Sequence, residues 1–343
     1  MHRFYLLLCL LLSTACQRLV LGEDEANTPE NNFSLFWKDF DQHYSLFEVR
    51  GWNWDSIRRA YEPLVSPQTT DEELFSIFSE MIAYLDDSHT FILWPGRDIF
   101  VSGAGAIDRV RAEFNYELIK EQYVDVIAES PENDLRYGRF RGRDIGYLHF
   151  PGIDLDDQDY IDVVIRDLRE RKAIIIDLRN NVGGEDRDAI AIGGRFQAEE
   201  RFVYTVQERN GPQHGDFAEK ITFFSRPLGK ESFLKPIVVL TDEGTASAGE
   251  ILILHLQSAP EMTQIGTATA GDFSDTGMRR FLPNGMEYRY SIMKFLLPDG
   301  TSLDGVGLVP DIEVRNSTED LAAGRDAVLE RAFRFLFEEY GIE

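Results

Sequence analysis

A serine, Ser247, stands where a predicted strand meets a predicted helix. The apolar run 237–240 is typical of a buried strand, residues 242–244 carry turn signals, and a helical apolar pattern begins near Ala246. This order places the side chain at a helix N-terminus, where N–H groups and the helix dipole stabilise negative charge that develops on a carbonyl oxygen. Ser247 therefore suits a nucleophile of acyl transfer, although the same position also suits an ordinary helix cap.

Two glycines, Gly183 and Gly184, follow a second apolar strand at 173–179. Glycine lets the backbone turn sharply and direct N–H groups toward a substrate oxygen. We expect the N–H of Gly183 or Gly184, together with that of Ala248, to form an oxyanion hole. A plain turn between strand and helix would use the same glycines, and the two interpretations are compatible.

A histidine, His89, follows Ser88 at the end of a predicted helix that begins with the capping signature 70–73. An imidazole of near-neutral pKa suits a general base that takes the proton of a serine hydroxyl. By itself, a histidine at a helix C-terminus more often interacts with the helix dipole.

Four stretches in order along the chain carry a family resemblance: 85–90, 177–184, 245–250 and 305–312. They resemble the tail-specific, or C-terminal-processing, serine peptidases, in the branch with the tricorn protease core and the interphotoreceptor retinoid-binding modules. The resemblance extends from about residue 33 to the end. It implies an α/β core of the Clp protease/crotonase type, a peptide or protein substrate, and Ser247 as the nucleophile.

The same resemblance implies which residues support the nucleophile. Branches with a PDZ domain use a lysine base, but the corresponding position here is Asp272, and an acid cannot replace that amine. The branch without the lysine implies His89 as base, with Ser88 orienting it and Asp304 orienting Ser88. Asp304 also suits a turn-stabilising role. Glu250 is expected either to orient the site or to stabilise the helix, and Asp272 is left without a role.

The scaffold also leaves a non-catalytic function open, because the same branch includes modules that bind apolar ligands. Retention of the serine, the histidine and an acid favours the peptidase. The sequence contains no zinc motif, phosphate loop or dinucleotide fingerprint, so no metal or cofactor is implied. A net charge of −25 over 343 residues argues against nucleic acid and anionic membrane surfaces as partners.

The N-terminus predicts export. Arg3 is followed by an apolar run of signal-peptide length, so residues 1–15 are interpreted as a signal peptide. Cys16 then resembles the lipid-modified cysteine of a bacterial lipoprotein, although Ser13 departs from that pattern. We expect a protein of the bacterial cell envelope, either a lipoprotein or periplasmic, with secretion as the alternative.

The remaining organisation follows from hydrophobic patterns. A flexible linker is expected at 16–32, a helical subdomain at 33–95, a small β-rich connection at 96–143 and the peptidase core at 144–343. Strand candidates in and before the connection are 91–94, 109–119 and 123–129. Apolar strands alternating with helices in the core predict a mainly parallel sheet covered on both faces, and the chain closes with one amphipathic helix at 321–340.

Overall fold

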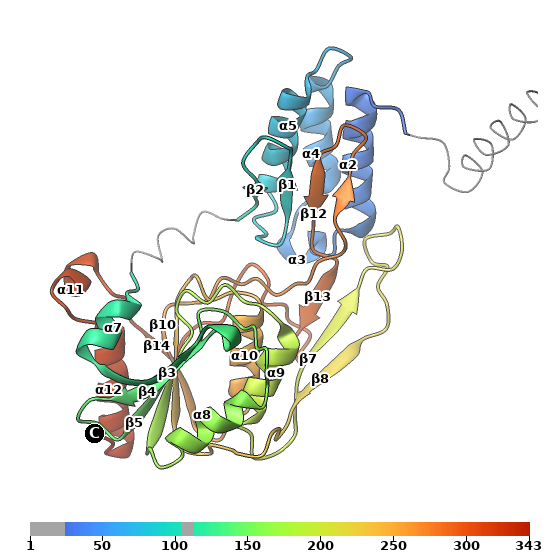
Figure 1. The fold of residues 1–343 in the computed structure, drawn as a ribbon. Coiled ribbons are helices and arrows are strands. Elements are labelled where there is room, and N and C mark those ends of the chain that lie inside the picture. Colours follow the sequence, from blue (N-terminus) through green and yellow to red (C-terminus); the bar gives the residue numbers. More distant parts are fainter. Residues whose placement is uncertain (1–24, 104–112) are drawn as a thin grey trace, which may run out of the picture.

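The computed structural model describes residues 25–103 and 113–343. The predicted signal peptide, Cys16 and most of the predicted linker lie outside these residues. Figure 1 shows an N-terminal helical unit that stands on a larger α/β core.

The core is built on a seven-stranded mixed sheet with strand order β14-β10-β9-β6-β5-β4-β3. The five strands from β14 to β5 run parallel, whereas β4 and β3 continue the sheet antiparallel. The strands are β3 (Val124–Ser130), β4 (Leu135–Phe140), β5 (Ile145–His149), β6 (Ala173–Asp177), β9 (Ile237–Thr241), β10 (Met262–Gly266) and β14 (Ile312–Glu313).

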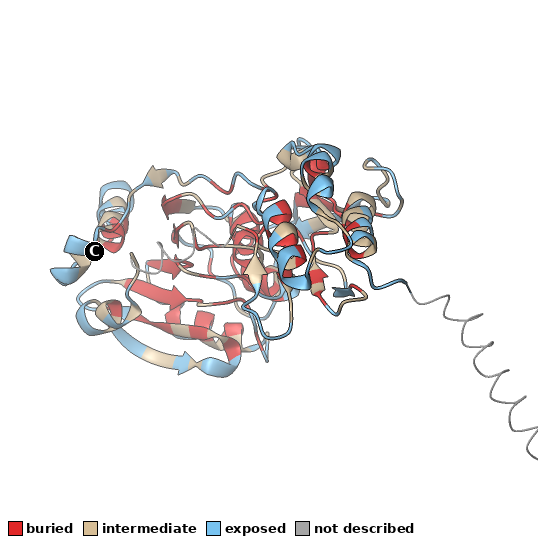
Figure 2. Cartoon of the chain, turned by 90° about the horizontal axis from the view of Figure 1, so that it is seen from above, coloured by how far each residue is buried: buried red, intermediate tan, exposed pale blue. Residues whose placement is uncertain are grey.

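Helices cover both faces of this sheet. One face packs against α8 (Tyr160–Leu168), α9 (Asp186–Gly194) and α10 (Ala248–Leu256), and the other against α7 (Tyr116–Gln122) and α12 (Ala327–Tyr340). Figure 2 shows the buried residues gathered on the strands and on the inner sides of the helices. Because β5, β6 and β9 are apolar at nearly every position and fully buried, they require cover on both sides. The expected α/β architecture is confirmed.

The N-terminal unit combines helices with a small sheet. Its helices are α2 (Pro29–His43), α3 (Phe47–Arg50), α4 (Trp54–Tyr61) with a 3-10 turn at Glu62–Leu64, and α5 (Asp71–Ala83). Its four-stranded sheet has the order β11-β12-β1-β2, from β1 (Phe91–Leu93), β2 (Phe100–Val101), β11 (Arg280–Phe281) and β12 (Glu287–Arg289). Late strands thus pair with early ones, and they join the unit to the core.

An aromatic cluster holds this unit together. Phe40 is fully buried and lies within 6 Å of the rings of Phe36, Trp54, Tyr288 and Tyr290. Offset and edge-on aromatic pairs add to the free energy gained by burial. Since Tyr288 lies in β12 and Tyr290 directly follows that strand, the cluster fixes the helices against the segment that returns from the core.

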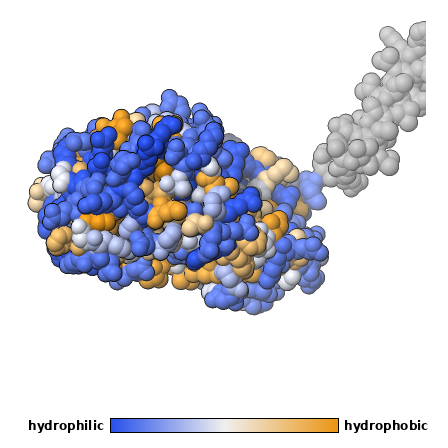
Figure 3. Space-filling view, turned by 90° about the horizontal axis from the view of Figure 1, so that it is seen from below, coloured by the Kyte–Doolittle hydropathy of each residue, from blue (hydrophilic) through white to orange (hydrophobic). Residues whose placement is uncertain are grey.

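A third sheet, β13-β7-β8, extends from the core and consists of β7 (Arg201–Glu208), β8 (Ile221–Ser225) and β13 (Met293–Leu296). The face of the molecule in Figure 3 is mostly hydrophilic, with separate hydrophobic patches. None of the helices in the described residues has the length and apolar character needed to cross a membrane.

Two expectations about local structure need correction, one before the core and one at the last helix. Residues 109–112 of the strand candidate at 109–119 lie outside the described residues, and its last residues belong to α7, because the side chain of Asn115 accepts the N–H of Leu118 (3.1 Å) and so starts a helix. The division into linker, helical subdomain, connection and core stays a prediction; within its bounds, residues 96–143 supply β3 and β4 to the core sheet, and α2 begins at Pro29.

The last helix is divided in two. A short helix, α11 (Thr318–Ala322), ends before Gly324, whose φ of +76° lies in the left-handed region. Asp326 then caps α12 by accepting the N–H of Leu329 at 3.0 Å. Two cap signals within this stretch therefore outweigh its continuous amphipathic pattern.

Candidate active site

Ser247 occupies the sharp turn between β9 and α10. Its backbone has φ 53° and ψ −124°, a conformation that non-glycine residues rarely adopt and that tertiary contacts must hold. Its N–H donates to Glu250 Oε2 at 3.1 Å, while its Oγ lies 3.3 Å from His89 Nε2. The hydroxyl is thus directed at an imidazole, which favours the nucleophile over the ordinary cap.

His89 reaches the core from the segment that follows α5. The carboxylate of Asp87 holds this segment, accepting the His89 N–H at 3.0 Å and the Thr90 hydroxyl at 2.8 Å. The second ring nitrogen, Nδ1, lies 2.7 Å from Asp272 Oδ1. An imidazole between a hydroxyl and a carboxylate can take a proton at one nitrogen while the acid balances the charge at the other.

Asp272, for which the sequence implied no role, therefore lies where an acid that supports His89 would lie. Its carboxylate contacts His89 and accepts a hydrogen bond from the Ser88 hydroxyl. Burial by itself lowers the pKa of His89, but the charge and hydrogen bonding of Asp272, together with the charges of Asp87 and Asp304, outweigh burial and raise this pKa to about 9. Burial raises the pKa of Asp272, and the imidazolium and the Ser88 hydrogen bond overcome that effect and hold it below its ordinary value.

Glu250 links the nucleophile to the acid. Its fully buried carboxylate accepts the N–H groups of Ser247 (3.1 Å), Gly271 (2.8 Å) and Asp272 (2.7 Å) and the Thr269 hydroxyl (2.5 Å). Burial raises the pKa of Glu250 to about 8, although these donors act to lower it. Glu250 was expected either to orient the site or to stabilise the helix, and these contacts with Ser247 and Asp272 favour the first role.

The contacts of Asp304 differ from the expectation. Ser88 was expected to bridge Asp304 to the imidazole, but its hydroxyl donates to Asp272. Asp304 Oδ1 instead lies 2.5 Å from Nε of Arg50, and the two side chains are 0% and 8% exposed. A buried guanidinium requires a nearby carboxylate, so the short Asp304 side chain is committed to Arg50. Burial raises the pKa of Asp304 to about 7, against the lowering effect of Arg50.

The double glycine lies directly beside the nucleophile. A Cβ on Gly183 would come 2.6 Å from Ser247 Cβ, and its φ is +93°. The Gly183 N–H donates to Asn181 Oδ1 at 2.9 Å, whereas the N–H groups of Gly184 and Ala248 have no acceptor in the described part of the chain. Of the expected oxyanion donors, these two remain available.

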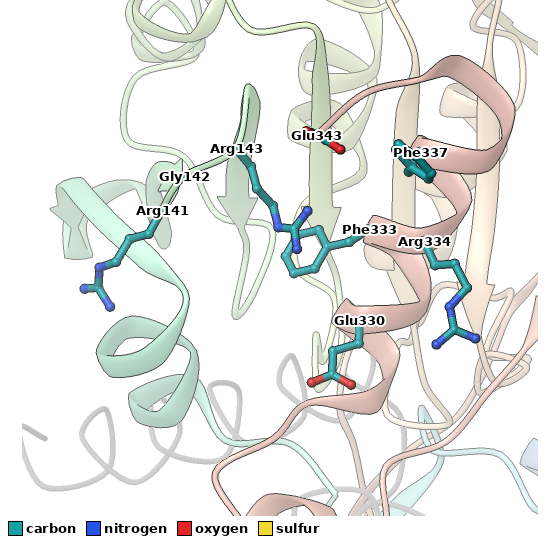
Figure 4. A pocket seen from close by; sticks show the side chains of 8 residues that line it. All are labelled: Arg141, Gly142, Arg143, Glu330, Phe333, Arg334, Phe337 and Glu343. Atoms are coloured by element: carbon teal, nitrogen blue, oxygen red, sulfur yellow. The ribbon is translucent and has the colours of Figure 1, made fainter.

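A hollow of about 330 Å³ opens onto this cluster. Ser88, His89, Ser247 and Asp272 line it, as does Arg50. A second hollow of about 460 Å³ lies beside α12, where Arg143 stacks on Phe333 at 4.3 Å (Figure 4). Its lining contains neither a hydroxyl nucleophile nor a histidine, so the chemistry belongs to the first hollow.

One group among the described residues has donor atoms close enough for a metal ion, namely Asp87, His89 and Asp272. Both oxygens of Asp87 accept hydrogen bonds from its own loop, His89 Nε2 faces Ser247 Oγ, and His89 Nδ1 is in ion-pair distance of Asp272 Oδ1. These contacts account for the grouping of the three side chains.

Sequence reasoning did not assign roles to Asp272, Asp87 or Arg50. A signal existed for Asp272, because an acid at a position expected to face the nucleophile cannot act as the lysine base but can support a histidine. Arg50 gives no comparable signal, since it is one of many arginines and ends a four-residue helix.

The scaffold is that of the Clp protease/crotonase-like peptidases. More narrowly, the chain belongs to peptidase family S41, whose model matches residues 144–314, and the model of the tricorn protease C1 domain matches residues 26–83.

Individual relatives agree with this family. A carboxy-terminal-processing protease of Bartonella bacilliformis is 31% identical over 54% of this chain and 42% of its own length. A carboxyl-terminal-processing protease of a Picosynechococcus species is 25% identical over 85% and 86% of the two chains. The crystal structure of a peptidase from Parabacteroides merdae superposes with a TM-score of 0.79 at 26% identity, covering 91% of this chain and 97% of the other. The chain spans less than half the length of the first two curated relatives it matches.

Proposed function

We propose that this protein is a serine-type endopeptidase that hydrolyses peptide bonds in unstructured polypeptides or peptides. The observation that carries the proposal is the continuous contact from Ser247 Oγ to His89 Nε2 (3.3 Å) and from His89 Nδ1 to Asp272 Oδ1 (2.7 Å). Membership of a peptidase family and the hollow above these atoms support it.

In this mechanism His89 takes the Ser247 proton while Oγ attacks the substrate carbonyl carbon. Asp272 balances the charge of the imidazolium and holds the ring in place. The N–H of Ala248, with that of Gly184, donates to the developing oxyanion. His89 then protonates the leaving amine, and a water molecule that it activates hydrolyses the acyl-enzyme.

Ser88 and Glu250 act on the acid in this proposal. The Ser88 hydroxyl occupies one oxygen of Asp272, which leaves the other for the imidazole. Glu250 binds the N–H groups of both Ser247 and Asp272, so it sets the distance between nucleophile and acid.

A serine-directed fluorophosphonate probe tests the nucleophile, and hydrolysis of an unstructured protein such as casein tests the reaction. Wild type is expected to be labelled and active, and Ser247→Ala to lose both while keeping its unfolding temperature. Ser76→Ala is the matched control, because Ser76 is exposed on α5 and, within the described part of the chain, its hydroxyl donates a hydrogen bond to the Glu72 carbonyl and to no other group. A folded wild type that is neither labelled nor active would favour the apolar-ligand-binding module instead.

We further propose that the protein is exported to the bacterial cell envelope and carries a lipid on Cys16. The proposal is supported by the apolar run after Arg3 and by the small residues before Cys16. A clickable palmitate analogue should label the wild-type chain in the membrane fraction, and Cys16→Ser should remove the label. An unlabelled wild-type chain in the soluble periplasmic fraction would contradict lipidation and keep export.

A further inference from the structure

Arg50 is a nearly buried cation at the boundary between the helical unit and the core. It ends α3, and its side chain is 8% exposed. Its Nη1 donates to the carbonyls of Leu85 (3.1 Å) and Asp86, and its Nε donates to Asp304 Oδ1 (2.5 Å). One guanidinium therefore joins two backbone carbonyls of the helical unit to a carboxylate of the core.

The two carbonyls belong to the segment that carries His89. Leu85 and Asp86 follow the last residue of α5, Ala83, where a helix leaves carbonyls without intrahelical donors. Asp86 has φ 50°, a left-handed conformation that surrounding contacts must maintain. Arg50 thus stabilises an unfavourable turn three residues before the proposed base.

The carboxylate belongs to a loop that supports Asp272. Next to Asp304, the Gly305 N–H donates to the Gly271 carbonyl at 2.7 Å, and the Leu308 N–H donates to Thr269 Oγ1 at 2.7 Å. A Cβ on Gly271 would come 2.6 Å from the nitrogen of Gly307, so the two loops are in close contact. A displacement of Asp304 is therefore transmitted to the segment that ends at Asp272.

We propose that Arg50 and Asp304 are positioning residues that set the geometry of the imidazole and its acid. His89 arrives from the helical unit and Asp272 from the core, and the Arg50–Asp304 pair crosses the same boundary, joining residues 254 positions apart. The inference rests on the proposed peptidase function. It assigns Asp304 a partner in Arg50 in place of Ser88, and it makes Arg50 necessary for the chemical step.

The test compares steady-state hydrolysis of a quenched peptide by Arg50→Ala, Arg50→Lys, Asp304→Ala and the double variant. Because a misplacement of about 1 Å can cost about 100-fold, kcat is expected to fall by about 10- to 100-fold, with KM unchanged within about threefold. The kcat of the double variant should be no lower than that of the less active single variant, since each single substitution already removes the same Arg50–Asp304 interaction. Added guanidinium should partly restore kcat in Arg50→Ala only.

Arg59→Ala is the matched control, because Arg59 is an exposed arginine of the neighbouring helix α4 whose guanidinium contacts only Ser56 among the described residues. Thermal unfolding accompanies each variant. Should Arg50→Ala fail to fold, Arg50→Lys carries the test: its ammonium retains the charge but lacks the fork that reaches two carbonyls and a carboxylate together, so an intermediate kcat is expected.

Three results would overturn the inference. A folded Arg50→Ala with kcat within twofold of wild type would show that the pair does not position the site. A rise in KM with unchanged kcat would mean that Arg50 binds substrate directly. Additive losses in the double variant would make the two residues independent. An inert wild type would instead contradict the proposed function itself.

Discussion

At the scale of single residues, the arrangement depends on which buried acid faces the imidazole. Asp272 and Asp304 are both buried, yet only Asp272 contacts His89, because Arg50 engages Asp304. In the proposed mechanism, the position that the resemblance aligns with the lysine base of the PDZ-containing branches carries the acid that supports a histidine base. An acid at this position can support catalysis only if another part of the chain supplies the basic nitrogen, which here is the imidazole of His89.

Activity is expected to rise with pH, because His89 acts as a base only when it is deprotonated and the nearby carboxylates, chiefly Asp272, raise its pKa to about 9 against the effect of burial. Wild-type kcat/KM should increase as pH rises through about 9. Asp272→Asn removes the negative charge, so the pKa of His89 falls and the rise in kcat/KM occurs at lower pH. The maximal rate should also fall by about 10⁴-fold, as expected when the acid of such a triad is replaced by its amide.

Initial rates measured from pH 6 to 10 in buffers of constant ionic strength check both effects. Asp125→Asn, a change at an exposed carboxylate on β3, controls for general charge effects. If kcat/KM of Asp272→Asn rises at the same pH as that of wild type, Asp272 is not the acid that supports His89.

Glu250→Gln tests the link between nucleophile and acid. Glutamine keeps the shape but replaces one acceptor oxygen with an amide that faces N–H donors, so at least one buried donor loses its partner. We expect a loss of about 1–3 kcal/mol in the free energy of unfolding and a reduced rate of fluorophosphonate labelling. Urea unfolding and labelling kinetics measure these effects, and Glu62→Gln on the exposed surface serves as the control. Unchanged labelling would assign Glu250 to helix stability only.

At the scale of elements, the site is formed where strands end and turns begin. Ser247 follows β9 and the double glycine follows β6, and these strands are parallel neighbours in the sheet. Parallel neighbours end at the same edge, so both turns face the same hollow. His89 does not come from the core sheet, and its position depends on how α5 is fastened to the core.

Gly183→Ala should reduce the reactivity of Ser247 by displacing it, although no catalytic side chain is changed. The added Cβ would lie 2.6 Å from Ser247 Cβ, and a φ of +93° adds strain of about 1–3 kcal/mol for a residue with a side chain. We expect fluorophosphonate labelling to slow by at least about tenfold. Gly215→Ala is the control, since no heavy atom lies within 4 Å of its added Cβ and its φ carries no such strain. Normal labelling of Gly183→Ala would mean that the turn can shift without loss.

At the scale of the whole molecule, the proposed mechanism requires that the helical unit stay fixed on the core. The chain achieves this by returning β11 and β12 from the core to pair beside β1, only two residues after His89. The aromatic cluster around Phe40 then binds the helices to the returning segment. The proposed base and nucleophile therefore come from separate parts of the molecule that these contacts hold together.

Phe40→Ala should consequently reduce both stability and activity. Removal of a fully buried phenylalanine costs about 3–5 kcal/mol in the free energy of unfolding, and the cavity loosens the unit that carries His89. Calorimetry and peptide hydrolysis measured below the transition check the two effects. Phe337→Ala, on the outer side of α12 with 53% exposure, should leave both nearly unchanged. Full activity in a destabilised Phe40→Ala would show that the unit need not be rigid.

The sequence by itself determined the features that depend on local pattern. The apolar strands, the capping box at Thr70 and Glu73, the turn that carries Ser247 and the double glycine all follow from residue types at short spacing. The four motifs were likewise sufficient to indicate the family. Where local signals competed, as in α7 and in the divided final helix, cap residues decided against the longer pattern.

Only the tertiary structure decided which acid serves the histidine. Ser88 and Asp272 are 184 positions apart and Arg50 and Asp304 are 254 apart, so no spacing rule relates them. The choice between two buried carboxylates depends on where each compensating cation or donor lies in space, because burial of a charge is tolerated only beside a partner. Arg50 supplies that partner to Asp304 and His89 supplies it to Asp272, which no pattern within one stretch of chain could reveal.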